Sequence, residues 1–231
     1  MSAKSVFAAL QPEAYPFVFE GELTVGKIMG GTPSDPRVAE GWLKSRLMDS
    51  EALLQEKVAS VMLERGLDAE GAVKAVDELK HLNGFKRDDQ GLYIEGRQLK
   101  AAIKEAASVA LAAGKIPARG WGKTNKGLLS YLAEHVFVVE DRLHLGVAEA
   151  SGVEQRFVHT WRGTGIQYEE FVLDAKIRFS VVCDHDFKDA EWAAIWMCGE
   201  KQGIGASRSQ GFGRYAVTRW DRVQRKTAKS S

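Results

Sequence analysis

The residues best suited to chemistry lie near the C-terminal end, in the segment GIGASRSQGFGR at residues 203–214. Its four glycines permit positive φ and let a second backbone approach closely. Its arginines carry charge that suits phosphate oxygens. Either this glycine loop holds a polyanion, or it packs tightly against its own fold. The candidate contacts are Gly203, Gly205, Ser207, Arg208, Ser209, Gln210, Gly211, Gly213 and Arg214.

Three further groups of side chains could contact nucleic acid. Arg97, Lys100 and Lys104 share one side of a helix predicted over 96–113, although an ordinary solvated helix face would look the same. Lys123 and Lys126 lie in a basic, glycine-bearing loop. A polar excursion at 148–168 holds Trp161, which could stack on a base, and two arginines for phosphates, Arg156 and Arg162.

The charge of the chain is unevenly distributed. The net charge is only +1. However, residues 201–231 contain eight Lys or Arg and one acid, and residues 97–126 contain seven Lys or Arg and one acid. A basic surface can therefore coexist with a neutral total. The alternative for residues 222–231 is a flexible basic tail without a binding role.

Composition excludes several classes of protein. The 231 residues are 45% hydrophobic and 27% charged, which fits one large or two small folded domains. Cys183 and Cys198 are the only cysteines, which argues against a structural zinc site or a disulfide scaffold. Neither a transmembrane run nor a signal-peptide core is present, so we expect a cytoplasmic location.

The residues identify no catalytic centre by themselves. The five histidines are scattered, and none lies near a serine or cysteine in a recognisable arrangement. Asp184-His185-Asp186 has the composition of a metal site, but a strand end followed by a helix cap explains it better.

Hydrophobic periodicity predicts the elements that must position these residues. Strands are expected at 17–25, 92–94, 136–145, 169–182 and 213–220. Helices are expected at 38–47, 50–65, 69–82 with Asp68 as N-cap, 96–113, and 187–199 with Asp186 as cap. Without insertions the order is β-α-β-β-α-β, an α+β ferredoxin-like (RRM) core with two helices on one face of the sheet. We predict a single domain with a helical insertion at 26–91 and a second insertion at 146–168.

Two segments resemble the CRISPR-associated RAMP superfamily, in its backbone-subunit branch. The segment from Tyr93 to Lys104 resembles that family's apolar-x-Gly-x-x-Leu-Lys helix entry, and the glycine loop resembles its C-terminal glycine-rich loop. Glu95 stands where proline is usual, and Arg97 and Gln98 stand where small residues are usual. The resemblance covers roughly 15–25, 92–113, 135–145 and 169–220.

The resemblance implies a subunit that binds single-stranded guide RNA independently of sequence. Such subunits oligomerise along the RNA within an effector complex of antiviral defense and need no cofactor. Their partners are the RNA, copies of themselves and other subunits. In this reading the insertion at 146–168 is a thumb-like hairpin that kinks the RNA.

The same resemblance leaves two alternatives open. Some backbone subunits cut target RNA with an aspartate and Mg²⁺, and Asp35 in the loop after the first strand is the nearest candidate. Asp before proline is also a common turn residue, so we expect no catalysis there. The other alternative is a protein of a phage or mobile element that coats nucleic acid or interferes with a CRISPR complex.

Overall fold

The computed structural model describes residues 15–33, 82–117, 127–160, 163–184 and 187–223, with short pieces between 59 and 71. The chain divides into two compact units. The first comprises Met1–Ile28, Arg87–Glu149 and Val172–Ser231, and the second comprises Met29–Lys86 and Ala150–Phe171. None of the described helices is long and apolar enough to cross a membrane.

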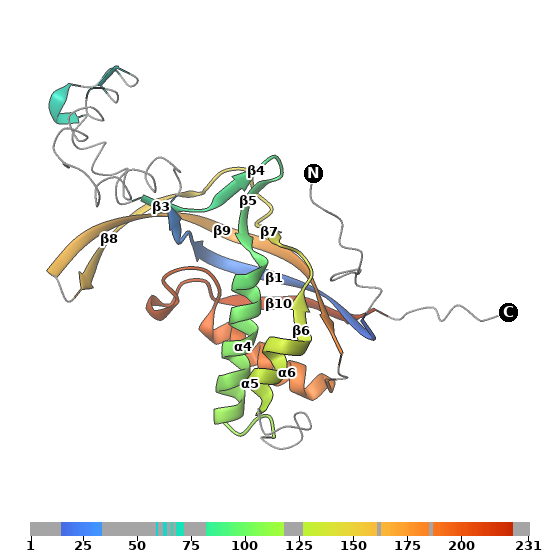
Figure 1. Ribbon diagram of the computed structural model, residues 1–231. Helices are drawn as coiled ribbons and strands as arrows, with labels where there is room; N and C mark the ends of the chain where they lie inside the picture. Colours follow the sequence, from blue (N-terminus) through green and yellow to red (C-terminus); the bar gives the residue numbers. More distant parts are fainter. Residues whose placement is uncertain are drawn as a thin grey trace. The chain divides into compact units, whose positions relative to one another are not determined.

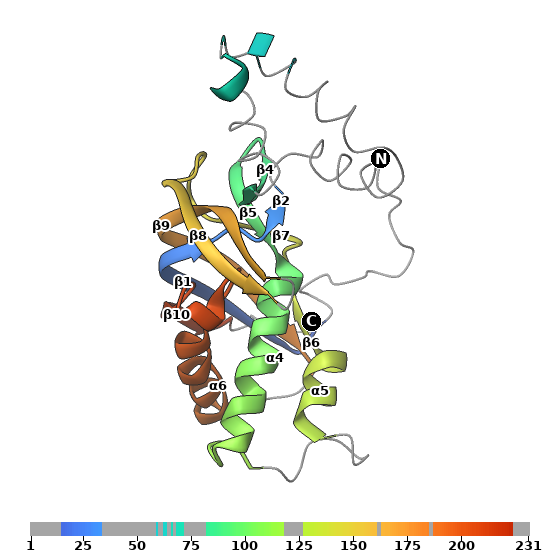
Figure 2. The ribbon, with the colours of Figure 1, turned by 90° about the vertical axis from the view of Figure 1, so that its left-hand side faces the viewer.

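The first unit contains the ferredoxin-like core that the sequence predicts. Its elements follow in the order β1 (Phe17–Met29), α4 (Gly96–Ala112), β6 (Val136–Val138), β9 (Gly163–Cys183), α6 (Asp189–Gln202) and β10 (Tyr215–Arg222). The sheet order is β10-β1-β9, and β6 also pairs with β9. Helices α4 and α6 pack together on one face of this sheet (Figures 1 and 2). The fold is therefore α+β and ferredoxin-like.

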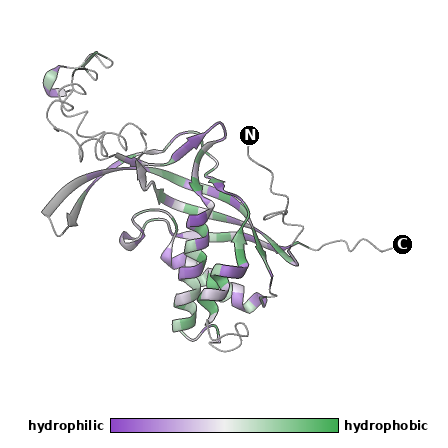
Figure 3. Cartoon of the chain, viewed as in Figure 1, coloured by the Kyte–Doolittle hydropathy of each residue, from purple (hydrophilic) through white to green (hydrophobic). Residues whose placement is uncertain are grey.

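The two faces of β1 show why these residues form the central strand. Phe19, Leu23 and Val25 alternate along one face and are fully or almost fully buried against the helices. Glu20 and Glu22 occupy the other face. Gly21 lies on the same buried side, where glycine is needed because a Cβ would overlap the ring of Phe179. Hydrophobic and hydrophilic residues accordingly alternate along the strands and helices of the core (Figure 3).

A β-bulge in β10 decides which of its side chains enter the core. Leu23 pairs with Val217 and Glu22 pairs with Arg219, so Thr218 is an extra residue in β10. Val217 and Trp220 consequently face the helices although they are three residues apart. Without the bulge, strict alternation from Val217 would place Arg219 in the core.

Backbone contacts set the two ends of α4. A Cβ at Gly96 would overlap the carbonyl oxygen of Glu140, and the Gly96 N–H donates to the Asp141 carbonyl at 2.9 Å. At the other end Gly114 has φ +67, and Lys115 N–H donates to the Ala110 carbonyl at 2.9 Å. This is the Schellman pattern, and it ends the helix predicted over 96–113.

A second, three-stranded sheet follows the order β4 (Lys86–Asp88), β5 (Gly91–Glu95) and β7 (Arg142–His144). Asp88 joins its strands, because its carboxylate accepts from Arg142 Nη1 at 2.8 Å and contacts His144 Nε2 at 3.0 Å. Burial raises the pKa of Asp88, but the hydrogen bonds from Arg142 and His144 outweigh it and lower the pKa overall. Helix α5 (Gly127–His135) precedes β6.

The second unit contributes several described strands. Strand β8 (Gly152–Thr160) forms an antiparallel hairpin with the first part of β9. Strand β3 (Leu82–Gly84) pairs parallel with β9, and β2 (Thr32–Pro33) pairs antiparallel with β3. Residues 146–168, predicted as a thumb-like insertion, thus include β8 and the start of β9. Their proposed role in kinking RNA stays a prediction.

Several element boundaries differ from those predicted. Strand β1 continues past Gly26 to Met29, since an exposed glycine does not interrupt a paired strand. The predicted strand 136–145 is two strands, because β6 pairs with β9 and β7 turns away to pair with β5. Helix α6 begins at Asp189, where the Glu191 carboxylate accepts from the Lys188 N–H at 2.9 Å. Asp186, the predicted cap, lies outside the described residues.

The insertion at 26–91 was predicted to be helical, but its two ends form β-strands. Residues 26–29 belong to β1, and 82–91 hold β3, β4 and the start of β5. Asp68 is confirmed as an N-cap, since its Oδ1 accepts from the Gly71 N–H at 2.8 Å. The helices predicted at 38–47 and most of those at 50–65 and 69–82 lie outside the described residues. Arg222, predicted to begin the tail, is the last residue of β10, and 224–231 are not described.

Candidate nucleic-acid interface

The glycine loop between α6 and β10 has repeated left-handed backbone. Positive φ occurs at Gly203 (78°), Gly205 (88°), Ser207 (57°), Gly211 (91°) and Gly213 (73°). A short 3₁₀ turn, Arg208–Gln210, lies in the middle. Glycine reaches these φ values without steric cost, which is why the sequence is glycine-rich here. The glycines therefore give the loop a defined backbone conformation.

The base of the loop is closed against its own fold. The Ile204 N–H donates to the Gly213 carbonyl at 2.9 Å, and the Gly213 N–H donates to the Lys27 carbonyl at 2.8 Å. A Cβ at Gly203 would lie 2.7 Å from the Gly213 carbonyl, and one at Gly213 would overlap the Ile204 carbonyl. Gly203 and Gly213 thus have a structural role, as the second of the two sequence interpretations expects.

The outer part of the loop is open. Ser209, Gln210 and Gly211 are exposed, and a Cβ at Gly211 would meet only Arg214 Nη2, at 4.0 Å. Gly211 is therefore required for its positive φ and not for lack of space. This part of the loop is the part that a ligand could reach.

The two arginines of the loop differ in their environment. Arg208 forms an ion pair with Glu105 of α4, with Nη1 to Oε2 at 2.7 Å. That contact holds the 3₁₀ turn against α4 and neutralises part of the charge of Arg208. Arg214 is exposed and makes no side-chain hydrogen bond or ion pair within the described part of the chain. Arg214 is accordingly the cation of the loop most available to phosphate.

Sequence reasoning missed two residues beside Arg214. The register of β1 and β10 places Lys27 next to the end of the loop, where its carbonyl binds Gly213. The Lys27 Nζ lies 5.2 Å from the ring centroid of Phe212. An aromatic ring and a lysine are thus in contact with each other, and both residues adjoin Gly213. No local signal in the sequence identifies Lys27, because its place depends on strand pairing.

The predicted basic face of α4 is largely occupied by other contacts. Arg97, whose side chain is 81% exposed, forms an ion pair with Glu95. Lys100 donates to the Ala133 carbonyl at 2.8 Å and lies 4.1 Å from the Phe137 ring centroid. Burial, then the charge of Lys104, lowers the pKa of Lys100. Lys104 alone of the three is exposed without such a partner among the described residues.

The N-terminus of α4 is also unsuited to binding an anion. Its first N–H is taken by the Asp141 carbonyl, and the Glu140 carbonyl lies against Gly96. This N–H and this approach to the backbone are therefore not available to an anion. Gly96 is explained by its close approach to Glu140, not by a phosphate.

We predict that replacing Lys100 with methionine leaves RNA affinity within about twofold of wild type, because the ammonium points into α5 and β6. Thermal stability should change by no more than about 1 kcal/mol, since one hydrogen bond and one cation–π contact are lost. Fluorescence anisotropy with labelled RNA and a thermal melt measure both effects. Lys104→Met is the matched comparison, and it should weaken binding. An equal loss in both variants would show that Lys100 reaches the RNA.

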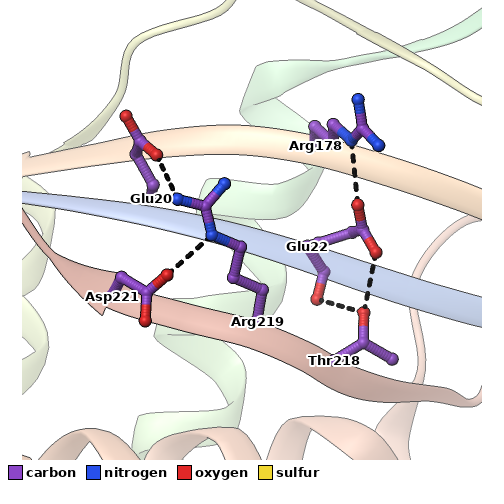
Figure 4. Close-up of polar contacts among 6 residues, drawn as sticks. All are labelled: Glu20, Glu22, Arg178, Thr218, Arg219 and Asp221. Carbon is purple, nitrogen blue, oxygen red and sulfur yellow. Dashed lines mark hydrogen bonds and ion pairs between the residues drawn. The ribbon is translucent and has the colours of Figure 1, made fainter.

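The other face of the core sheet is a network of paired charges (Figure 4). Glu22 accepts from Arg178 Nε at 2.8 Å, and Arg219 donates to Glu20 at 2.6 Å and to Asp221 at 2.6 Å. The hydrogen bonds from Arg178 and then Thr218 lower the pKa of Glu22. These side chains present carboxylates where an RRM that stacks bases on its sheet presents aromatic rings. Ion-paired side chains of this kind do not provide the rings on which an RRM sheet stacks bases.

In the second unit, Arg156 turns inward. Its Nη2 lies 2.5 Å from Glu169 Oε2, and the two side chains are only 9% and 3% exposed. The sequence predicts that Arg156 contacts phosphate. In the structure its charge is instead paired with that of Glu169 inside the β8–β9 hairpin. Phe157, the next residue, is 68% exposed and was not singled out from the sequence. Trp161 and Arg162 lie outside the described residues, as do Lys123 and Lys126.

The described residues include no group of three or more His, Cys, Asp or Glu that could hold a metal ion. Asp184 contacts His135 Nδ1 at 3.1 Å, whereas His185 and Asp186 are not described. Asp35 also lies outside the described residues, so the metal-dependent alternative stays a prediction.

No protein-family model matches the sequence, and no curated protein does so either. Among solved structures the chain is similar to one from a "Cryo-EM structure of the Type III-B Cmr-beta bound to cognate target RNA". The identity is 8% and the TM-score 0.49, over 92% of this chain and 62% of the other. This chain thus spans less than two thirds of the length of that one. At these values the likeness assigns neither a partner nor a role.

Proposed function

We propose that this protein binds single-stranded RNA through the outer part of the glycine loop. The observation that carries the proposal is the exposed guanidinium of Arg214, which lies next to Gly211 on a loop whose backbone shape is fixed by its glycines. Residues 201–214 contain three basic side chains and no acid, so the local field favours an anion. Lys104, on α4 next to the Glu105 that holds Arg208, extends the positive charge.

The recognition is sequence-independent. Guanidinium and ammonium groups contact phosphates, which are the same at every nucleotide. Phe212 offers a ring face, and stacking on a ring tolerates any base. Phe157 on the β8–β9 hairpin offers a second exposed ring.

The finer role is part of the same proposal and is supported by the two motifs. We infer a backbone subunit of a CRISPR-type effector complex in the cytoplasm, which oligomerises along guide RNA together with other subunits and without a cofactor. The helix entry from Tyr93 to Lys104 and the glycine loop lie on the expected elements of a ferredoxin-like core. The paired charges of the opposite sheet face favour the loop as the contact surface.

Two labelled single-stranded RNAs of unrelated sequence test the proposal by fluorescence anisotropy over a salt series. We expect affinities within about threefold of each other. The slope of log K against log salt should be about −2 to −3, as three or four phosphate contacts give with single strands. A strong preference for one sequence that persists at high salt would contradict phosphate-led binding. Absence of measurable binding at low salt would contradict the function itself.

A further inference from the structure

Strand β8 in the second unit has one edge that no described strand covers. Among the strands that the structure describes, β8 pairs with β9 alone. The strand runs from Gly152 to Thr160 and contains neither lysine nor proline, two residues that commonly keep an edge strand from pairing with another chain. A strand edge of this length can therefore accept a further strand.

The hydrogen bonds of β9 show which residues of β8 direct their backbone groups to this edge. The Glu170 carbonyl accepts from the Gly30 N–H at 2.9 Å, so it is turned away from β8. Glu170 and its cross-strand partner Val153 consequently form a non-hydrogen-bonded pair. Because such positions alternate along a strand, Val153, Gln155 and Phe157 all direct their N–H and C=O groups to the open edge.

The side chains of the same three residues share one face of β8 and are exposed. Val153 is 52% exposed and Phe157 is 68% exposed. Gln155, which lies between them, is exposed as well. Two large apolar side chains on one strand face gain free energy when a neighbouring strand covers them.

The segment from Val153 to Phe157 is complementary to itself in the antiparallel direction. With Gln155 opposite Gln155 of a second copy, Val153 lies opposite Phe157. In the same register Glu154 lies opposite Arg156. A β-branched side chain opposite an aromatic ring and two opposite charges are both favourable cross-strand pairs. This register also brings the outward-directed backbone groups of the two strands together.

The charges within the hairpin favour a second copy as the partner. Glu154 lies directly opposite Glu169 in the β8–β9 pair, and Arg156 forms an ion pair with Glu169. This row therefore contains two carboxylates and one guanidinium, and its net charge is negative. A second copy brings another guanidinium to the edge side of Glu154, where it attracts that carboxylate.

We propose that two copies of this chain pair through β8, antiparallel and centred on Gln155, so that the two β8–β9 hairpins form one continuous sheet. The contact is isologous and closes at two copies. It goes beyond the proposed assembly along RNA, which repeats and depends on the RNA. Pairing through β8 takes place without RNA, so its test is separate from that of the proposed function.

Sedimentation velocity of the full chain, freed of nucleic acid by nuclease treatment, tests the proposal over a concentration series. We expect the average mass to rise from one chain towards two as the concentration increases. Gln155→Lys and Gln155→Glu each place two like charges opposite each other at the two-fold axis, so each should weaken self-association at least about fivefold. An equimolar mixture of the two variants should restore it, because lysine then lies opposite glutamate.

The matched controls are Ala101→Lys and Ala101→Glu, which make the same charge changes at an exposed position of α4. Both should associate as the wild type does, alone and mixed. A wild type that stays monomeric at every concentration would overturn the proposal. So would unchanged association of the single Gln155 variants, or a mixture that associates no better than either variant alone. Association that occurs only after RNA is added would assign the contact to RNA and not to β8.

Discussion

Replacing Arg214 with glutamate should lower the affinity for single-stranded RNA about tenfold or more at low salt. The substitution removes one charge-assisted phosphate contact and places a carboxylate beside the remaining cations. Tenfold corresponds to about 1.4 kcal/mol, close to the lower end of what a single charged hydrogen bond contributes. The salt slope should also become shallower by about 0.7 or more, because at least one fewer counterion is released. Anisotropy titrations at several salt concentrations measure both quantities.

Lys176→Glu provides the matched control for this experiment. It changes the net charge of the chain by the same amount but lies on the sheet face whose charges are paired. We expect it to weaken binding by no more than about twofold. If the two reversals cost the same affinity, RNA responds to net charge alone and the glycine loop is not the contact. Thermal melts of both variants exclude unfolding as the cause.

Gly213→Val should be the most destabilising substitution in the loop, by about 2–4 kcal/mol. Gly213 has φ +73, and a Cβ there would overlap the Ile204 carbonyl, so strain and a steric clash add. Both hydrogen bonds at the base of the loop would be disturbed. Denaturant unfolding followed by tryptophan fluorescence measures the change in the free energy of unfolding.

Gly211→Ala separates the effect of backbone strain from that of steric overlap. Its φ of 91° is also unfavourable for alanine, but only Arg214 Nη2 lies near the new methyl group, at 4.0 Å. The expected cost is about 1–2 kcal/mol. A larger loss in Gly211→Ala than in Gly213→Val would mean that the base of the loop does not hold it together.

Local patterns predicted the core elements well. The apolar stripe and the glycines near both ends predicted a helix at 96–113, which is α4 (Gly96–Ala112), and alternation identified β1 and β9. Pairing partners were harder to predict. The pattern from Val136 to Leu145 predicts a single strand, and nothing local shows that its first part pairs with β9 and its second with β5. The bulge in β10 likewise depends on register with β1.

The candidate site was predictable where the backbone conformation requires glycine. The glycine loop was found from composition, but its division into a packed base and an open outer part depends on the contact between Gly213 and Ile204. Lys27 was missed because its position follows from strand pairing. Lys100 was predicted to contact RNA because helical spacing places it on the same side as Arg97 and Lys104. Spacing alone does not show that α5 covers this part of the helix.

Thr218 makes β10 one residue longer than its pairing with β1 requires. Its hydroxyl donates to the Glu22 carbonyl at 3.2 Å and to a Glu22 carboxylate oxygen at 3.1 Å, both on the solvent face. A chain lacking Thr218 would still pair Leu23 with Val217 and Glu22 with Arg219, and Trp220 would still face α6. Position 218 is thus a point where chain length can change by one residue while every neighbour keeps its face. Elsewhere in this sheet the same deletion would exchange buried and exposed residues along the rest of the strand.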